Sequence, residues 1–284
     1  MNTYILIFML GSIISVAFLL WRKSKRLSIL IVITLLSIFI YTGWKSYTSG
    51  LSFANQIDRL IDMPVSLTTS VFKDSTPISN HPIKDSVLLD VPIIKQLPEL
   101  PRGCEVTSLA MLLQHAGKDA DKLTLARQIK KNPAKMKKIN GQIYYGDPND
   151  GFIGDMYSTN QPGLGVYHTP IKELAERYMP NKIIDFTNSD FNQIKKHLSS
   201  KRPVWVIINT AYRKLEPSYF HTWITPNGTI SITYKEHSVL VTGYDQNYIY
   251  FNDPLTGIKN KKAPSADFEE AWVQMGKQAI TYKN

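Results

Sequence analysis

The sequence predicts an α+β domain, helices first and strands second, preceded by two membrane-spanning helices. Within residues 105–199, apolar residues recur at helical spacing in several segments. Within residues 203–252, β-branched and aromatic residues form short runs joined by hairpin-length connections. Helices and strands segregated along the chain in this way are typical of α+β folds with a largely antiparallel sheet. A third observation, two uncharged apolar stretches before residue 45, predicts the membrane helices.

Residues 1–45 are expected to form a two-helix transmembrane hairpin. The segments 4–21 and 27–44 carry no Asp, Glu, Lys or Arg, and the short loop between them holds four basic residues. The positive-inside rule places that loop in the cytoplasm, so both chain ends and the large carboxy-terminal part are expected outside the cell. A cleaved signal peptide fits poorly because its positive charge would precede the apolar run. Two buried helices of a soluble protein are the other alternative.

Residues 46–85 are polar and mixed in composition, which favours an extracytoplasmic linker or stalk. The domain is expected over residues 86–284, beginning with an extended segment at 87–94. Helices are predicted at 105–116, 123–129, 169–178, 190–199 and 268–275. Strands are predicted at 203–209, 229–234, 236–244 and 248–252. Between them, residues 140–166 are rich in Gly, Asp, Asn and Tyr, and we expect a long surface loop there that could line a substrate cleft.

Composition excludes several classes of protein. A single cysteine rules out an intrachain disulfide framework and cysteine-based zinc motifs, and the six histidines lack H-x-x-x-H spacing, so no metal or cofactor is expected. The net charge of +10 suits an anionic surface, but no nucleic-acid-binding motif is present. The basic residues of the 127–138 segment are candidates for contact with an anionic cell-wall polymer or lipid surface; a solvated helix end and loop is the alternative.

Cys104 is the candidate nucleophile. It follows a Pro- and Gly-bearing loop and precedes an apolar helical pattern, so its sulfur should lie at a helix amino terminus. Unpaired helix N–H groups and the positive end of the helix dipole favour the thiolate, which is the reactive form. The alternative is a small, buried and inert hydrophobic side chain.

Three further residues could complete a catalytic site. His237 begins one predicted strand and Asp253 ends the next, so a hairpin would place them side by side, with the carboxylate orienting the imidazole as the base for Cys104. Gln96, eight residues before Cys104, is a candidate oxyanion donor together with the backbone N–H of Cys104. Each alone could be structural, since histidine is often structural at a strand start and Asp-Pro is common in turns.

These residues resemble the C39-like cysteine peptidases, relatives of the papain-like peptidase domains of bacteriocin-processing transporters. The resemblance rests on Gln96 with Gly-Cys104-Glu-Val-Thr-Ser-Leu-Ala-Met, on Glu-His237-Ser-Val-Leu-Val-Thr-Gly-Tyr and on Asn-Asp253-Pro-Leu-Thr-Gly. It covers residues 89–257 and implies a papain-like fold, with Cys104 as nucleophile, His237 as general base and acid, Asp253 as its orienting residue and Gln96 as oxyanion donor. The chain has no G-x-x-x-x-G-K-[ST] motif and no transporter-length membrane region, so the resemblance is to stand-alone members.

The sequence therefore predicts a cysteine peptidase that is tethered to the membrane and acts on peptides or proteins outside the cell. Two other functions use the same residues. One is a non-catalytic module that binds a peptide or a wall polymer on the same scaffold, because a fold does not fix its chemistry. The other is a thiol amidase, transpeptidase or acyltransferase that acts on cell-wall material.

Overall fold

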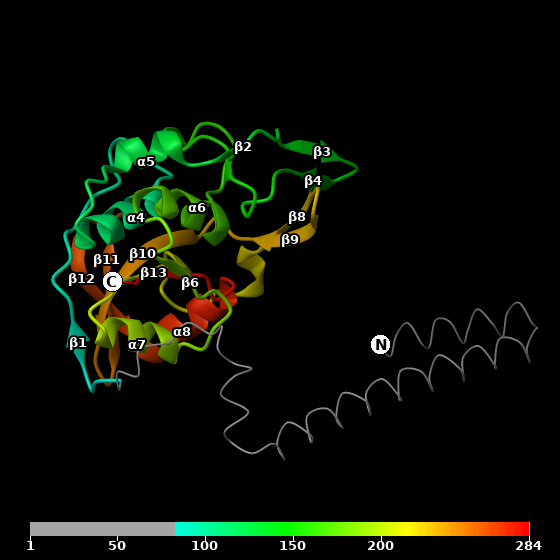
Figure 1. Ribbon diagram of the computed structural model, residues 1–284. Helices are drawn as coiled ribbons and strands as arrows, with labels where there is room; N and C mark the ends of the chain where they lie inside the picture. Colours follow the sequence, from blue (N-terminus) through cyan, green and yellow to red (C-terminus); the bar gives the residue numbers. More distant parts are fainter. Residues whose placement is uncertain (1–82, 284) are drawn as a thin grey trace, which may run out of the picture. The chain divides into compact units, whose positions relative to one another are not determined.

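The computed structural model describes residues 83–283 (Figure 1). The predicted transmembrane hairpin and nearly all of the predicted linker lie outside the described residues. Within residues 83–283, no helix is both long enough and apolar enough to cross a bilayer.

A seven-stranded antiparallel sheet forms the centre of the domain. Its strands are β1 (Val87–Leu88), β6 (Ile183–Asp185), β7 (Val204–Asn209), β10 (Glu236–Tyr244), β11 (Tyr248–Asp253), β12 (Ile258–Pro264) and β13 (Ala279–Tyr282). The order across the sheet is β12-β11-β10-β7-β13-β6, and β1 pairs with the last residues of β10. Every residue of β7 is buried, as expected for a strand covered on both faces.

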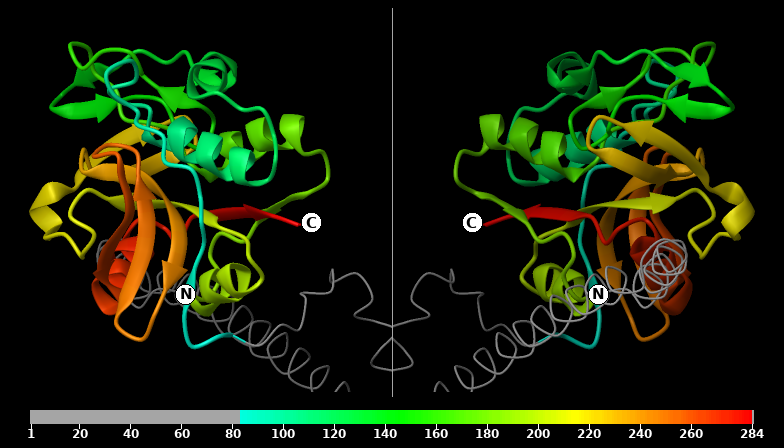
Figure 2. Two further views of the ribbon diagram at one scale, coloured as in Figure 1. Left: turned by 90° about the vertical axis from the view of Figure 1, so that its left-hand side faces the viewer. Right: turned by 90° about the vertical axis from the view of Figure 1, so that its right-hand side faces the viewer.

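Helices cover both faces of this sheet (Figures 1 and 2). One face carries α4 (Cys104–His115), α5 (Lys122–Gln128) and α6 (His168–Tyr178), and the other carries α7 (Asn192–Ser199) and α8 (Ser265–Gln274). The alternation of side chains along β7 supplies both layers of the core. Trp205 and Ile207 pack in the cluster that contains α4, whereas Val206 and Ile208 pack in the cluster that contains α7 and α8.

A second, smaller sheet lies at one end of the α4 layer. It joins β3 (Lys137–Ile139), β4 (Gln142–Tyr144), β8 (His221–Thr225) and β9 (Gly228–Ile232) in that order, around the buried ring of Trp223. A 3₁₀ turn (Pro217–Tyr219) precedes β8, and the short strands β2 (Lys131–Asn132) and β5 (Phe152–Ile153) pair in parallel. The segment predicted as one long loop therefore contributes two strands. That part of the prediction was wrong because these strands are only two or three residues long; β4 pairs with its neighbour β3 and with the distant β8, and β5 pairs with β2.

The predicted helices agree with the observed ones to within three residues at each end. The extended entry segment is regular only over β1, and eight strands were not predicted: β2, β3, β4, β5, β6, β8, β12 and β13. β12 was missed because its sequence, Ile-Lys-Asn-Lys-Lys-Ala-Pro, has the polar composition of an edge strand that is half exposed. The predicted class, α+β with a largely antiparallel sheet, is confirmed.

Candidate active site

Cys104 is the first residue of α4, and Gly103 caps the helix without a side-chain hydrogen bond. A Cβ atom at position 103 would lie 2.5 Å from the Cβ of Leu100, so the tight loop before the helix requires glycine there. The hydroxyl of Thr107 donates to the carbonyl of Gly103 at 2.7 Å and closes the first turn. This local geometry fixes where the thiol leaves the helix.

Two hydrogen bonds fasten the start of α4 to the central sheet. The indole Nε1 of Trp205 on β7 donates to the carbonyl of Glu105 at 3.0 Å, and the hydroxyl of Ser108 donates to the carbonyl of Ser238 on β10 at 3.1 Å. All four residues are buried, where such bonds are costly to break. They hold Cys104 beside the first residues of β10.

Cys104, His237 and Gln96 all line one cavity of about 660 Å³. Glu236 lines it too, next to His237, and the far wall comes from the 159–164 segment. A volume of this size is in the range of ligand and substrate pockets. The structure therefore brings together three of the four residues that the sequence singled out, and Asp253 joins them through His237.

His237 and Asp253 form a buried hydrogen-bonded pair. Nε2 of His237 lies 2.9 Å from Oδ1 of Asp253, and the two side chains are 2% and 0% exposed. The hairpin of β10 and β11 places them together, as the sequence predicts, although a bulge near Val241 shifts the register before the pair is reached. With Nε2 bonded to the carboxylate, Nδ1 is the imidazole nitrogen left for another partner.

Asp253 is held by more groups than the sequence indicates. Its Oδ2 accepts hydrogen bonds from Lys261 Nζ at 2.9 Å, the Tyr212 hydroxyl at 2.8 Å and the Thr256 hydroxyl at 2.7 Å. Burial raises the pKa of Asp253, but the hydrogen bonds from His237, Lys261 and Thr256 outweigh it, so its pKa lies well below the usual range. Asp253 is therefore a fixed anion. Sequence reasoning missed Lys261 and Tyr212 because neither belongs to a recognisable motif.

Gln96 occupies a different position from the one a free oxyanion donor would need. Its Nε2 donates to the carbonyls of Leu100 and Pro101, at 3.2 and 3.1 Å, so both amide hydrogens are engaged in the loop before α4. Its Oε1 is buried with no partner among the described residues. Gln96 lines the cavity and braces the loop that presents Cys104, and it would have to release a carbonyl before it could bind an oxyanion.

The thiol of Cys104 donates a hydrogen bond to Oε2 of its neighbour Glu105, at 3.2 Å. Burial raises the pKa of the Cys104 thiol well above its ordinary value, and the nearby carboxyl groups of Glu105 and Glu236 raise it further. The expectation that the helix amino terminus favours the thiolate is therefore wrong for this resting structure. Loss of water and two acidic neighbours outweigh the helix dipole.

The pleat of β10 explains why an acidic side chain, rather than the imidazole, lies beside the sulfur. Leu240, two pleats from Glu236 on the same strand, belongs to the core cluster of α4, whereas Val239 belongs to the cluster of α7 and α8. Because side chains alternate between the two faces along β10, Glu236 points toward α4 and His237 points toward the face that carries α7 and α8. Both residues lie at the start of β10, where the cavity opens. From the sequence, Glu105 and Glu236 were included only as members of the motifs around Cys104 and His237, and neither of them was assigned a role in the site.

Cys104, Glu105 and Glu236 also have the spacing of metal ligands, since their donor atoms all lie within 4.8 Å of one another. The donor set does not fit the common zinc sites, which use several cysteines or histidines, or two histidines with one carboxylate. We therefore assign no metal to this cluster.

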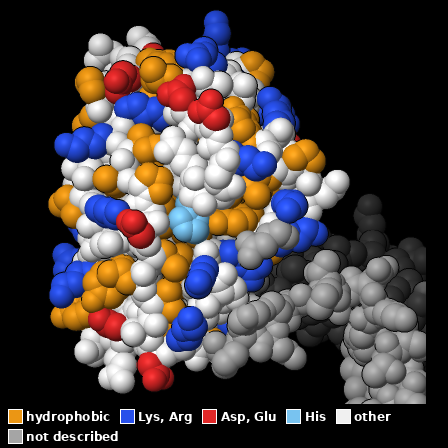
Figure 3. All heavy atoms as spheres, turned by 60° about the vertical axis from the view of Figure 1, so that its left-hand side comes forward, with side chains coloured by type: hydrophobic (Ala, Val, Ile, Leu, Met, Phe, Trp, Pro, Cys, Tyr) orange, Lys and Arg blue, Asp and Glu red, His pale blue; other side chains and the backbone are white. Residues whose placement is uncertain are grey.

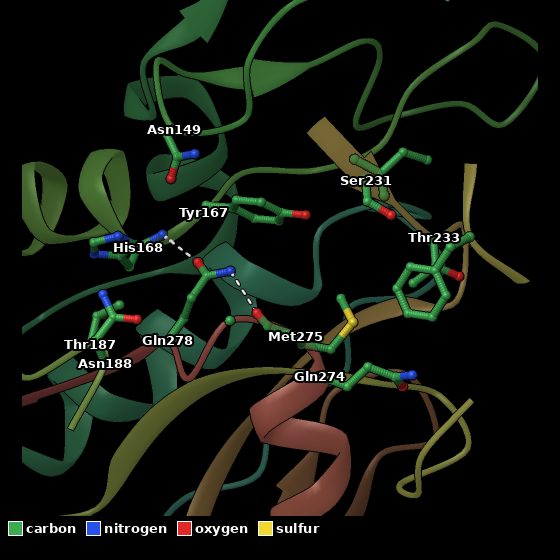
Figure 4. A pocket seen from close by; sticks show the side chains of 13 residues that line it. Asn149, Tyr167, His168, Thr187, Asn188, Ser231, Thr233, Gln274, Met275 and Gln278 are labelled. Carbon is green, nitrogen blue, oxygen red and sulfur yellow. Dashed lines mark hydrogen bonds between the residues drawn. The ribbon is translucent and has the colours of Figure 1, made fainter. Parts of the chain in front are cut away.

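A second cavity, of about 290 Å³, lies near the start of α6 (Figure 4). The backbone N–H of His168 donates to Oε1 of Gln278 at 3.0 Å, and Gln278 Nε2 donates to the carbonyl of Met275 at 3.0 Å. The ring of Tyr167 points into this cavity, which holds no thiol and shares no lining residue with the first. The larger cavity, with Cys104 and His237, is the candidate active site.

Three findings relate the chain to known proteins. Residues 88–280 match the model of the Peptidase_C39 like family. The chain is 43% identical over 261 residues to the uncharacterized protein YvpB of Bacillus subtilis (strain 168), covering 90% of this chain and 98% of that one. The crystal structure of a protein from Bacillus anthracis, described as a C39-like peptidase, is 46% identical with a TM-score of 0.67 and covers 71% of this chain and 98% of its own. The chain therefore belongs to the Peptidase_C39 like family.

Proposed function

We propose that this protein is a membrane-tethered cysteine peptidase that hydrolyses peptide bonds outside the cell. The observation that carries the proposal is the cavity in which Cys104 lies with His237, whose imidazole is bonded to the fixed anion Asp253. A nucleophile, a base and a group that orients the base are the minimum set for thiol catalysis. The family and the similar structure from Bacillus anthracis support a peptidase of this kind.

The chemistry would proceed through an acyl-enzyme. Asp253 accepts a hydrogen bond from Nε2 of His237, which leaves Nδ1 to take the proton of the Cys104 thiol. The thiolate attacks the substrate carbonyl, and the imidazolium then protonates the leaving amine. Water, deprotonated by His237, hydrolyses the thioester and releases the acid product.

The oxyanion of this reaction needs hydrogen-bond donors. The backbone N–H of Cys104 lies at the amino terminus of α4, where helix N–H groups have no partner within the helix. Gln96 lines the same cavity, and its Nε2 would become the second donor by exchanging one of its two backbone carbonyls for the oxyanion.

Location and surface charge complete the proposal. The predicted hairpin of residues 1–45 would hold the domain at the outer face of the membrane. Basic residues of the 127–138 segment are exposed in the structure, and Met136 within it lines the cavity, so this segment borders the candidate cleft. Figure 3 shows Lys and Arg side chains in several separate groups on the face that it displays. We propose that the 127–138 segment contacts an anionic wall polymer or lipid surface near the site of cleavage.

Product analysis tests the proposed reaction. The purified full chain is incubated separately with a peptide library and with cell-wall fragments, and mass spectrometry identifies new termini; Cys104→Ala and His237→Ala are the controls. We expect new peptide termini with the wild type alone. Binding without cleavage would indicate the non-catalytic module, and products from wall fragments alone would indicate an amidase or transpeptidase. Cleavage of the library by Cys104→Ala would refute the proposal.

A further inference from the structure

Two carboxyl groups, those of Glu105 and Glu236, lie beside the sulfur of Cys104 on the α4 side of the central sheet. The reactive atoms of the three residues are all within 4.8 Å of one another. Glu105 is fully buried, and Oε1 of Glu236 is shielded from solvent without a hydrogen-bond partner among the described residues. A thiol with a histidine base needs no carboxyl group here, so this pair requires its own explanation.

The fold provides a specific place for both carboxyl groups. Oε1 of Glu105 accepts a hydrogen bond from the backbone N–H of Val166 at 2.7 Å, and Oε2 accepts the thiol hydrogen of Cys104. A Cβ atom at Gly165 would lie 2.0 Å from Oε1 of Glu105 and 2.9 Å from Oε2 of Glu236. The absent side chain at position 165 thus gives room to both carboxyl groups at once.

No described cation is hydrogen-bonded to this pair. Lys131 is attracted by the charge of Glu105, but its Nζ donates to the carbonyl of Ala126 instead. The guanidinium of Arg102 lines the same cavity and donates to backbone carbonyls of the 155–161 loop.

The remaining titratable neighbours do not neutralise the pair either. Nε2 of His237 is bonded to Asp253. Tyr167 stays a neutral phenol, because burial, with the charges of Glu236 and of Asp147, raises its pKa well above the usual range. Two ionised carboxylates this close in a buried site repel each other, which favours a proton held between them. In agreement with this geometry, burial raises the pKa of Glu105 to about 7, and burial with the charge of Glu105 raises that of Glu236 well above its ordinary value.

We infer that Glu105 is a further catalytic residue, which, paired with Glu236, holds the thiol of Cys104 in the resting enzyme and releases it to His237 when the pair gains a proton. In the resting state the Glu105 carboxylate accepts the S–H hydrogen bond. When a solvent proton enters the pair, the protonated Glu105 donates to the sulfur instead, and the thiol proton moves to His237. The products are a thiolate and an imidazolium, and the only addition is the proton on the pair. The inference rests on the proposed function for the identity of the nucleophile.

The rate at which iodoacetamide alkylates Cys104 in the full chain tests this inference without a peptide substrate. In the wild type we expect this rate to fall as the pH rises through about 7, the pKa of Glu105. Glu105→Gln keeps the shape of the side chain and donates to sulfur at every pH, so the fall should disappear. At pH 8 this variant should react about 10- to 100-fold faster than the wild type, the ratio expected for one hydrogen bond to a charged group.

Two further variants separate Glu105 from a general effect of charge. In Glu236→Gln the fall should remain near pH 7, because burial raises the pKa of Glu105 and Glu236 is still protonated when Glu105 ionises. Glu173→Gln removes an exposed carboxylate on α6 and should leave the profile unchanged. A Glu105→Gln profile that keeps the wild-type fall, or a Glu236→Gln profile that loses it, would overturn the inference.

Folding and the proposed function are checked separately. Near-ultraviolet circular dichroism at pH 6 shows whether each variant is folded. If a variant is unfolded, the pH profile of alkylation in the wild type still tests the inference. A wild-type alkylation rate that rises steadily with pH overturns it. If His237→Ala alkylates like the wild type at every pH, the proposed base is wrong. If His237→Ala is slow but Glu105→Gln behaves like the wild type, only the role of the carboxyl pair is wrong.

Discussion

Replacing Lys261 by methionine tests the idea that Asp253 is a fixed anion. Lys261 Nζ lies 2.9 Å from Oδ2 of Asp253, and the lysine side chain is 25% exposed while the aspartate is fully buried. The same ammonium donates to the hydroxyl of Tyr212 at 3.1 Å and lies 4.4 Å from the centre of its ring. Lys261→Met keeps the aliphatic stem and removes the charge.

The magnitude follows from burial. Removing one member of a fully buried pair costs about 3–5 kcal/mol, because the partner is left uncompensated. Lys261 is partly solvated, and Asp253 keeps the hydrogen bonds from His237, Tyr212 and Thr256, so we expect a loss of about 1–3 kcal/mol in the free energy of unfolding at pH 7. Lys259→Met is the matched control on the same strand, since Lys259 pairs with Asp90, which is 94% exposed. Its expected loss is about 0–1 kcal/mol.

Urea unfolding of both variants at several pH values is the assay. A carboxyl group whose pKa is lowered by folding stabilises the protein above its unfolded pKa of about 3.9, and that contribution is lost as the pH falls through the folded pKa. Lys261→Met makes the pKa of folded Asp253 less depressed, so the deficit of this variant relative to the wild type should be complete at pH 7. The deficit should shrink only once the pH falls below the folded pKa of Asp253 in the variant, which itself lies below the unfolded value of about 3.9. Equal losses in the two variants, or a deficit at pH 7 that persists unchanged at low pH, would refute the reasoning.

Three other predictions concern the supports of the site and the topology of the chain. Gly165→Ala places a methyl group against Glu105 and should destabilise the fold by about 1–3 kcal/mol, measured by thermal unfolding. Trp205→Phe removes the indole donor to the Glu105 carbonyl and should cost about 1–3 kcal/mol, where an unchanged melting temperature would contradict the anchoring role. Ser86→Cys in a Cys104→Ser background should react with a membrane-impermeant maleimide in intact cells; protection would contradict the extracellular location.

The helices and the central hairpin could be predicted because their signals are local. The apolar spacing after Cys104 marks α4, and two runs of β-branched and aromatic residues separated by a short turn mark β10 and β11. The pairing of His237 with Asp253 followed from hairpin geometry alone, without any knowledge of the rest of the sheet. In the second sheet only β9 was predicted; β3 and β4 are three residues long, and β4 pairs both with β3 and with β8, about 80 residues further along the chain.

The surroundings of the thiol were harder to predict than its position. A helix amino terminus favours a thiolate, and the sequence shows the helix; it does not show that the site is buried or that Gly165 admits two carboxyl groups. Glu105 and Glu236 come together only through the packing of α4 on β10 and of the 163–166 segment against both. Burial therefore reversed the expected direction of the pKa shift of Cys104.

The most direct test of the account is whether Cys104 forms an acyl-enzyme with the help of His237. The full chain is mixed with p-nitrophenyl acetate at pH 6, release of p-nitrophenol is followed during the first turnover, and the quenched protein is mapped by mass spectrometry. The account predicts a burst that matches the enzyme concentration, an acetyl group on Cys104, and a burst at least about tenfold slower in His237→Ala. An acetyl group on any other residue, or equal bursts in the wild type and His237→Ala, would contradict it.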